Sequence, residues 1–317
     1  MITNPFLFIV GCPRSGTTLL QRVVDAHPQI AITPETHWVA RWFEKRKGMT
    51  PEGFVKPKLI PKLVRHGRCA RMQIGKEQLE RLLGTGEPVF YSNFVTGIFD
   101  LYGEAQGKQL VGDKTPGYVR KLKTLHELWP SAKFVHLIRD GRDVCLSMAQ
   151  WEKAHRSAGR FSSWTDDSVV TTALYWEWHV RWGREAGPAL GSDLYYEIRY
   201  EDFVARPADE CAALCSFLGV PFDDAMLGFH EGRTTRAPGL STKDQWLPIT
   251  PGLRNWKTEM SARDTARFEL SAGRLIDELA YPRTGQHPPG RVEEIARIRD
   301  MFSNDVRSLG EALPASW

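Results

Sequence analysis

The stretch Gly11-Cys12-Pro13-Arg14-Ser15-Gly16-Thr17-Thr18 combines residue types that bind anions. Its two glycines have the spacing of the loop that holds the phosphates of nucleoside triphosphates, but Thr17 stands where that loop carries its lysine. Backbone N–H groups at the start of a following helix bind phosphate and sulfate alike, and Arg14 adds a cation. The stretch predicts an anion-binding loop, with a plain turn before a helix as the alternative.

A second group of polar residues follows the apolar run Phe134–Ile138. Arg139 comes directly after the run, and Ser147 lies two helical turns further along the chain. If the run is a strand and the next segment a helix, both side chains reach one phosphate, where arginine forms paired hydrogen bonds and serine adds a donor. A surface ion pair of Arg139 with Asp140 or Asp143 is the competing interpretation.

The two motifs together resemble the sulfotransferases that use 3′-phosphoadenosine 5′-phosphosulfate (PAPS), most closely the tyrosylprotein-type and related bacterial members. The resemblance covers about residues 5–220. It implies that the loop residues Arg14, Ser15, Gly16, Thr17 and Thr18 hold the 5′-phosphosulfate of PAPS, and that Arg139 and Ser147 hold its 3′-phosphate.

Three further segments extend the resemblance. Pro34-Glu35-Thr36 resembles the segment that carries the family's general base, which implies that role for Glu35. Asp113-Lys114-Thr115-Pro116 implies that Lys114, together with Arg14, contacts the transferred group, and the segment Arg199–Phe203 implies that Tyr200 lies near the nucleotide. His37 stays open as a rival base, because an imidazole titrates near neutrality.

The resemblance implies transfer of a sulfuryl group from PAPS to a hydroxyl by in-line displacement with a carboxylate general base. The phosphate of PAPS is already a competent leaving group, so no metal is required. Two alternatives remain: a phosphate-loop small-molecule kinase, which needs a lysine at Thr17, and a catalytically idle PAPS-binding protein. The acceptor stays open among phenols, sugars, lipid alcohols and peptide tyrosines, and so does the oligomeric state.

The elements that position these residues alternate along the chain, which predicts an α/β, three-layer P-loop-type fold. We expect one domain over residues 1–317, with a mostly parallel central sheet flanked by helices. The expected strands are Phe6–Val10, Gln109–Val111, Phe134–Ile138 and Leu194–Ile198. The expected helices are Thr17–Ala26, Pro116–Leu128 with Thr115 as its N-cap, Arg142–Trp151, Ser168–Glu185 and a helix between Pro207 and Gly219.

The alternation of strands and helices fails between Arg41 and Lys76, where the chain has many basic residues and only two acidic ones, Glu44 and Glu52. We expect a helical and loop lid, or acceptor-side insertion, at about residues 38–108 that borders the acceptor entrance and favours negatively charged acceptors. A solvated helical face is the alternative. Another irregular stretch, roughly Glu231 to Asn255, predicts a surface loop. The segment Gly252–Lys257, which overlaps its end, resembles a motif of cytosolic sulfotransferases: it retains the Trp-Lys end but lacks the Arg-Lys-Gly, so the residues that complete the 3′-phosphate site stay open.

Composition excludes other classes. The formal net charge of +4 is too small to indicate a nucleic-acid partner. Five cysteines without a C-x-x-C pair predict neither a disulfide framework nor a zinc site and favour the cytoplasm. We expect no metal, no secretion signal and no membrane span. Four tryptophans are candidates for an acceptor pocket or, more simply, for the core: Trp164, Trp176, Trp178 and Trp182.

Overall fold

The computed structural model describes residues 3–84, 86–231, 248–252, 254–285 and 292–317. The surface loop expected between Glu231 and Asn255 therefore falls mostly outside the described residues. The expected single domain and the bounds of its insertion stay predictions.

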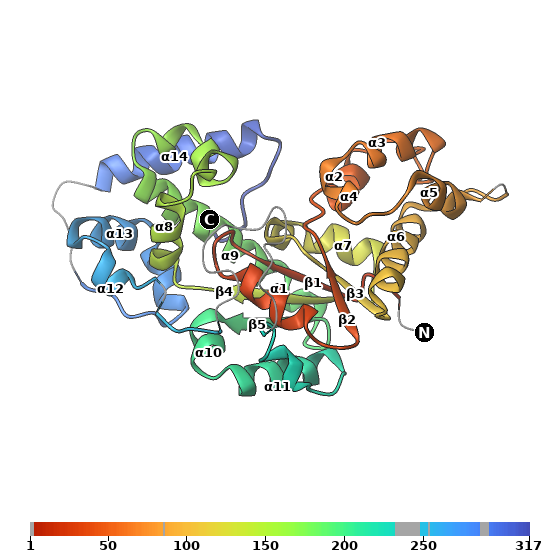
Figure 1. Cartoon of the computed structure of the whole chain (residues 1–317). Helices are drawn as coiled ribbons and strands as arrows, with labels where there is room; N and C mark the ends of the chain where they lie inside the picture. Colours follow the sequence, from red (N-terminus) through yellow and green to blue (C-terminus); the bar gives the residue numbers. More distant parts are fainter. Residues whose placement is uncertain (1–2, 85, 232–247, 253, 286–291) are drawn as a thin grey trace.

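A five-stranded sheet lies at the centre of the molecule (Figure 1). The strands are β1 (Leu7–Gly11), β2 (Ile30–Thr33), β3 (Leu110–Lys114), β4 (Lys133–Ile138) and β5 (Tyr195–Arg199). Their order is β2-β3-β1-β4-β5, and every neighbouring pair is parallel. This confirms the predicted α/β class and the parallel sheet.

Helices cover both faces of the sheet because its central strands are apolar on both sides. Leu7 and Ile9 of β1 pack with helices α1, α10 and α11, whereas Phe8 and Val10 belong to the cluster on the other face. The α-helices of the fold core are α1 (Thr17–Asp25), α6 (Tyr91–Gln106), α7 (Leu122–Leu128), α8 (Gly141–Ala149), α9 (Ser168–Ala186), α10 (Tyr200–Ala205) and α11 (Pro207–Leu218). The three predicted layers are present.

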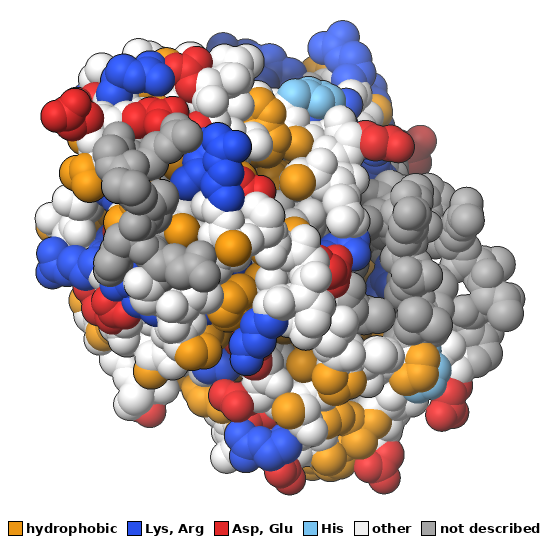
Figure 2. All heavy atoms as spheres, turned by 90° about the vertical axis from the view of Figure 1, so that its left-hand side faces the viewer, with side chains coloured by type: hydrophobic (Ala, Val, Ile, Leu, Met, Phe, Trp, Pro, Cys, Tyr) orange, Lys and Arg blue, Asp and Glu red, His pale blue; other side chains and the backbone are white. Residues whose placement is uncertain are grey.

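The C-terminal part adds α12 (Trp256–Glu259), α13 (Ala262–Glu278) and α14 (Val292–Ser308), which pack beside α8 and α9. Trp176 and Trp178 are fully buried in this cluster, and Trp164 and Trp182 pack against it. The four tryptophans therefore belong to the core, as the simpler interpretation holds. On the face shown in Figure 2, basic side chains are interspersed with acidic ones and apolar ones.

Between β2 and β3 the chain forms α2 (Val39–Glu44), α3 (Ile60–Val64), α4 (Gly67–Ala70) and α5 (Lys76–Leu83) before α6. These short helices share a buried cluster with α6 and α7. In Figure 1 they stand at the opposite end of the sheet from α12, α13 and α14. Lys121 links the two ends, because its Nζ lies 3.0 Å from Glu44 of α2 and 3.5 Å from Glu311 in the C-terminal tail.

Three expectations about local structure were wrong. Strand β2 was not foreseen, since it has only four residues. Strand β3 runs on to Lys114 rather than ending at Val111, because its polar residues are buried and bonded. Residues Pro116–Lys121 form a 3₁₀ helix before α7, and the Thr115 hydroxyl accepts the Thr36 N–H at 3.0 Å instead of capping a helix.

The remaining strand and helix predictions agree with the structure to within a few residues at each end. No helix among the described residues is long and apolar enough to cross a membrane.

The close packing of α9 on the sheet generates a stability prediction. Changing a glycine inside a helix to alanine normally raises the free energy of unfolding by about 1 kcal/mol. At Gly183 the new Cβ would lie 2.4 Å from Cε1 of buried His136. We expect Gly183→Ala to lower the free energy of unfolding by about 1–3 kcal/mol, the usual cost of overpacking. Denaturant unfolding measures this.

Gly67→Ala in α4 is the matched control, because no atom lies within 4 Å of the added Cβ. It should leave the free energy of unfolding unchanged or slightly raised. Equal stability of Gly183→Ala and the unaltered protein would contradict the packing argument.

Candidate active site

The loop between β1 and α1 leads directly into the N-terminus of α1. Gly16 precedes α1 with φ at 93°, a left-handed conformation that favours glycine, and α1 has no side-chain cap. The N–H groups of a first helical turn have no partner within the helix, and the positive end of the helix dipole lies there. These features suit the binding of an anion, which stays a prediction for this loop.

Tyr200 covers this loop from the end of β5. A Cβ on Gly16 would lie 2.5 Å from the Tyr200 ring, so only glycine allows the ring to pack there. The guanidinium of Arg139 lies 4.1 Å from the centre of the same ring. Burial raises the pKa of Tyr200, which keeps the phenol neutral. Tyr200 thus joins the loop to Arg139.

Three guanidinium groups gather beside the loop. Burial and the neighbouring Arg254 and Arg139 lower the pKa of Arg14, whose Nε donates to Ser147 Oγ at 3.0 Å. Within the described part of the chain, Nε of Arg139, Nε of Arg254 and the hydroxyl of Ser15 are buried without a hydrogen-bond partner. Buried polar groups normally have partners, so this cluster has the chemistry of a phosphate site.

Arg139 also makes the ion pair that was the alternative interpretation. Its Nη2 lies 3.1 Å from Oδ2 of Asp143, and Oδ1 of Asp143 accepts the Trp256 N–H at 2.9 Å. In the part of the chain that the structure describes, Arg139 makes no hydrogen bond with Ser147, which is bonded to Arg14 instead. The ion pair fixes Arg139 through one nitrogen and leaves its Nε available.

Lys114 and Glu35 form an ion pair on the other side of the loop. Lys114 Nζ lies 2.5 Å from Oε1 of Glu35 and 3.3 Å from the hydroxyl of Thr18. The Lys114 side chain is 1% exposed, and that of Glu35 is 29% exposed. Burial alone would raise the pKa of Glu35, but Lys114 and His37 outweigh it and hold that pKa well below its usual range. Glu35 is thus an ionised carboxylate.

The second oxygen of Glu35 has two further donors. His37 Nε2 lies 2.9 Å from Oε2, and Arg68 Nη1 of α4 lies 3.1 Å from it. Arg68 also donates to the backbone carbonyl of Glu35 at 3.3 Å. The two candidate bases, Glu35 and His37, are therefore in direct contact.

Buried hydrogen bonds fix the turn that carries Glu35. The N–H of Thr36 donates to Asp113 Oδ2 at 3.3 Å, and the hydroxyl of Thr33 donates to the same oxygen at 3.2 Å. Burial raises the pKa of Asp113 to about 6. Since Asp113 precedes Lys114 on β3, one strand end positions both partners of the ion pair.

The structure adds residues that the sequence analysis did not assign to the site. Arg68 is one of many basic residues between Arg41 and Lys76, and its contact with Glu35 joins residues 33 positions apart. Arg254 lies in the stretch where the 3′-phosphate residues were left open. Trp151 stacks on Arg14, with 5.1 Å between guanidinium and ring centre. No local sequence pattern indicates these contacts.

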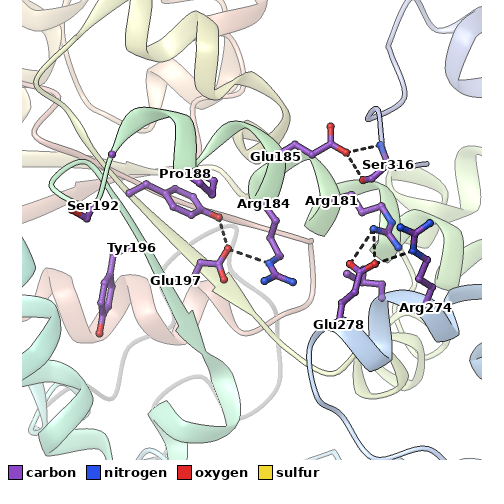
Figure 3. A pocket seen from close by; sticks show the side chains of 13 residues that line it. Arg181, Arg184, Glu185, Pro188, Ser192, Tyr196, Glu197, Arg274, Glu278 and Ser316 are labelled. Atoms are coloured by element: carbon purple, nitrogen blue, oxygen red, sulfur yellow. Dashed lines mark hydrogen bonds and ion pairs between the residues drawn. The ribbon is translucent and has the colours of Figure 1, made fainter.

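A cleft of about 1030 Å³ lies away from these residues, at the start of β5 (Figure 3). Its charged side chains are largely paired: Arg181 and Arg274 both reach Glu278, and Arg184 lies 3.6 Å from Glu197. Ligands of parallel sheets bind beyond the carboxyl ends of the strands, where Lys114 and Arg139 lie. We therefore place the active site at that end.

Similarity to known proteins extends over most of the chain. A model of the sulfotransferase family matches residues 5–224. Protein-tyrosine sulfotransferase 1 of Danio rerio is 27% identical over 312 residues, which are 96% of this chain and 79% of that protein. Protein-tyrosine sulfotransferase A of Caenorhabditis elegans is 25% identical over 72% of this chain, which spans only 53% of the worm protein.

Among solved structures, the sulfotransferase domain of a Synechococcus olefin synthase superposes with a TM-score of 0.57 at 26% identity. The match covers 88% of this chain and 96% of that domain.

The chain belongs to the sulfotransferase family. The sequence resemblance to that family is confirmed. The fold and the loop agree with this assignment.

The arginine cluster generates a binding prediction. Arg139→Ala should raise the dissociation constant for adenosine 3′,5′-bisphosphate by about 10- to 100-fold, because a charge-assisted hydrogen bond contributes roughly 1.5–3 kcal/mol. AMP, which lacks the 3′-phosphate, should bind the unaltered protein distinctly less well and should respond little to the change. Titration calorimetry with both nucleotides measures the difference.

Arg206→Ala removes an exposed arginine of the α10–α11 junction and serves as control. Equal affinity of the unaltered protein for AMP and the bisphosphate would refute the 3′-phosphate site.

Proposed function

We propose that the chain transfers the sulfuryl group of PAPS to a hydroxyl acceptor, with Glu35 as the group that removes the hydroxyl proton. The observation that carries the proposal is the Glu35–Lys114 ion pair beside the anion loop. The pair brings a carboxylate and a buried ammonium together beside the N-terminus of α1, where we expect the anionic donor to bind.

The reaction needs one bond to form and one to break. The acceptor oxygen bonds to sulfur while the bond between sulfur and the bridging oxygen breaks, and adenosine 3′,5′-bisphosphate leaves with that electron pair. Lys114, Arg14 and the loop N–H groups stabilise the negative charge on the sulfuryl and bridging oxygens. The chain thus supplies positioning and charge stabilisation.

Glu35 suits the role of base better than His37 for a geometric reason. Its carboxylate bonds directly to Lys114, whereas the contact of His37 with this group runs through Glu35. The His37 side chain is also more exposed, at 43% against 29% for Glu35. We therefore assign proton removal to Glu35 and orientation of the carboxylate to His37.

The relatives suggest which acceptor to test first. Two of them are named protein-tyrosine sulfotransferases, so a tyrosine phenol leads the set of acceptors. Sugars and lipid alcohols follow, and a mass gain of one sulfate identifies the product.

The base assignment generates the next prediction. Glu35→Gln should keep its affinity for adenosine 3′,5′-bisphosphate and lose about 10²- to 10⁴-fold in kcat, the usual contribution of a general base. The amide keeps the shape of the side chain but cannot accept the proton. Single-turnover kinetics and calorimetry separate the two effects.

His37→Ala is the companion variant and should reduce kcat less, because it removes only an orienting hydrogen bond. Full activity of Glu35→Gln together with an inactive His37→Ala would move the base to His37.

We further propose that the basic segment Arg41–Lys76, called the lid here, favours negatively charged acceptors. Its Arg68 bonds to Glu35, the proposed base, which supports a position of the lid beside the acceptor. Lys47 and Arg46 lie over aromatic rings of α2, with Nζ 4.4 Å from the centre of Trp42 and Cζ 4.1 Å from that of Phe43. Their charges are thus held on the lid surface.

Reversing Lys45, Arg46 and Lys47 to glutamate should raise KM for an anionic acceptor several-fold and change PAPS binding less. Salt should weaken the effect, because charges are screened over about 10 Å at 0.1 M. Steady-state kinetics at two ionic strengths measure both.

Reversal of the exposed Arg263, Arg274 and Arg307 on α13 and α14 is the charge-matched control. An acceptor KM unaffected by the lid reversal and by salt would remove the lid from acceptor binding and leave sulfuryl transfer untouched.

A further inference from the structure

The turn Thr36–Val39, which leads from Glu35 into α2, has a strained backbone. His37 has a φ of 51°, in the left-handed region that residues with a side chain rarely adopt. Such a conformation costs free energy and persists only where the surrounding structure holds it. In this conformation Nε2 of His37 lies 2.9 Å from Oε2 of Glu35. Whatever holds the turn therefore also bears on the orientation of the proposed base.

The hydroxyl of Tyr118 holds both ends of the turn. It lies 2.7 Å from the hydroxyl of Thr36 and accepts the N–H of Val39 at 3.0 Å. Both partners are buried. Val39 is the first residue of α2, so its N–H has no partner within the helix. One phenol thus bonds to the residues on either side of His37 and Trp38.

Tyr118 is itself fixed by its place in the fold. Strand β3 ends at Lys114, and the 3₁₀ helix Pro116–Lys121 carries Tyr118 shortly after it. Tyr118 is only 4% exposed, and its ring packs edge-on against Phe8 of β1 with 6.2 Å between ring centres. Burial raises the pKa of the phenol, so the hydroxyl keeps its proton and can donate as well as accept. The turn is therefore supported from the rigid centre of the sheet.

We propose that Tyr118 is a positioning residue for sulfuryl transfer: its hydroxyl holds the turn before α2 so that His37 stays bonded to the carboxylate of Glu35. The inference rests on the proposed function of Glu35 as the base. Tyr118 makes its contribution through that carboxylate, from beneath the turn, and takes no part in the chemistry itself.

Removing the hydroxyl should let the turn relax. In Tyr118→Phe the buried hydroxyl of Thr36 and the N–H of Val39 lose this partner, and leaving buried polar groups unpaired is costly. A move of His37 out of the left-handed region relieves the strain at the same time. The imidazole then leaves the proposed base, whose carboxylate loses one of the bonds that fix its direction. The N–H of Thr36 stays bonded to Asp113, so the change remains local.

Tyr118→Phe deletes the hydroxyl, keeps the ring, and is tested in single-turnover reactions with PAPS and a tyrosine-containing peptide. The rate should fall about 10- to 100-fold, because a small misplacement of a reacting group has an effect of that size. The dissociation constant for adenosine 3′,5′-bisphosphate, measured by calorimetry, should stay unchanged, since the turn lies on the acceptor side of the loop.

The same change in a Glu35→Gln background separates positioning from a general effect on the fold. Tyr118→Phe should lower the rate no further there, because residues that act through one group are not additive. A merely structural role of Tyr118 would lower the rate by one factor in both backgrounds, and that result would overturn the proposal. Full activity of Glu35→Gln would refute the proposed function itself, which is a different outcome.

Tyr91→Phe is the matched control. Its buried hydroxyl donates to the carbonyl of Val39 at 2.9 Å, so the variant loses a similar bond without touching the Thr36 hydroxyl. It should leave the single-turnover rate unchanged. Thr36→Val removes the other hydroxyl of the pair and should reproduce the loss seen in Tyr118→Phe. The two changes together should be no slower than the slower single variant, and additive losses would contradict the shared role.

A second measurement needs no turnover. The ring Cε1–H signal of His37 in nuclear magnetic resonance spectra is assigned by its absence from His37→Ala, and it reports the contact with Glu35. In Tyr118→Phe it should shift toward its position in Glu35→Ala, whereas Tyr91→Phe should leave it in place. A His37 signal that Tyr118→Phe does not move would overturn the proposal, whichever acceptor the protein uses.

Discussion

Lys114 carries an ammonium group on a side chain that is only 1% exposed, so this charge needs a partner within the protein. The arrangement of the candidate active site depends on that partner. Removing one partner of a buried ion pair costs about 3–5 kcal/mol, so a carboxylate must stand beside Lys114. Glu35 supplies it from the turn after β2, and Thr18 of α1 accepts a further hydrogen bond. One buried charge therefore brings together the end of β3, the turn after β2 and the first turn of α1.

The charges on the two sides of the loop are arranged differently, and the difference suits two tasks. On one side Arg14, Arg139 and Arg254 lie close enough to lower the pKa of Arg14, so an incoming phosphate relieves their repulsion. On the other side the basic groups surround the carboxylate of Glu35. The first arrangement is suited to holding an anion, and the second keeps the carboxylate of Glu35 ionised.

The sequence predicts the fold class and much of the site because those features depend on local patterns. An apolar run followed by a glycine-containing loop specifies β1, the loop and α1. The residues at the carboxyl ends of β3 and β4 lie at the same end of the sheet because the strands are parallel. Strand β2 was not predicted, because a run of four residues is too short to show a hydrophobic periodicity. The contact of Arg68 with Glu35 and the approach of Arg254 to Arg14 depend on how distant segments pack, which spacing along the chain does not encode.

The central claim is that the anion loop and the Glu35–Lys114 pair transfer a sulfuryl group rather than a phosphoryl group. The most direct measurement incubates the protein and a tyrosine-containing peptide with sulfur-labelled PAPS or, separately, with γ-phosphorus-labelled ATP, each with and without a chelator. The account predicts label on the peptide from PAPS in both conditions and none from ATP. Label from ATP that disappears with the chelator, and none from PAPS, would contradict it.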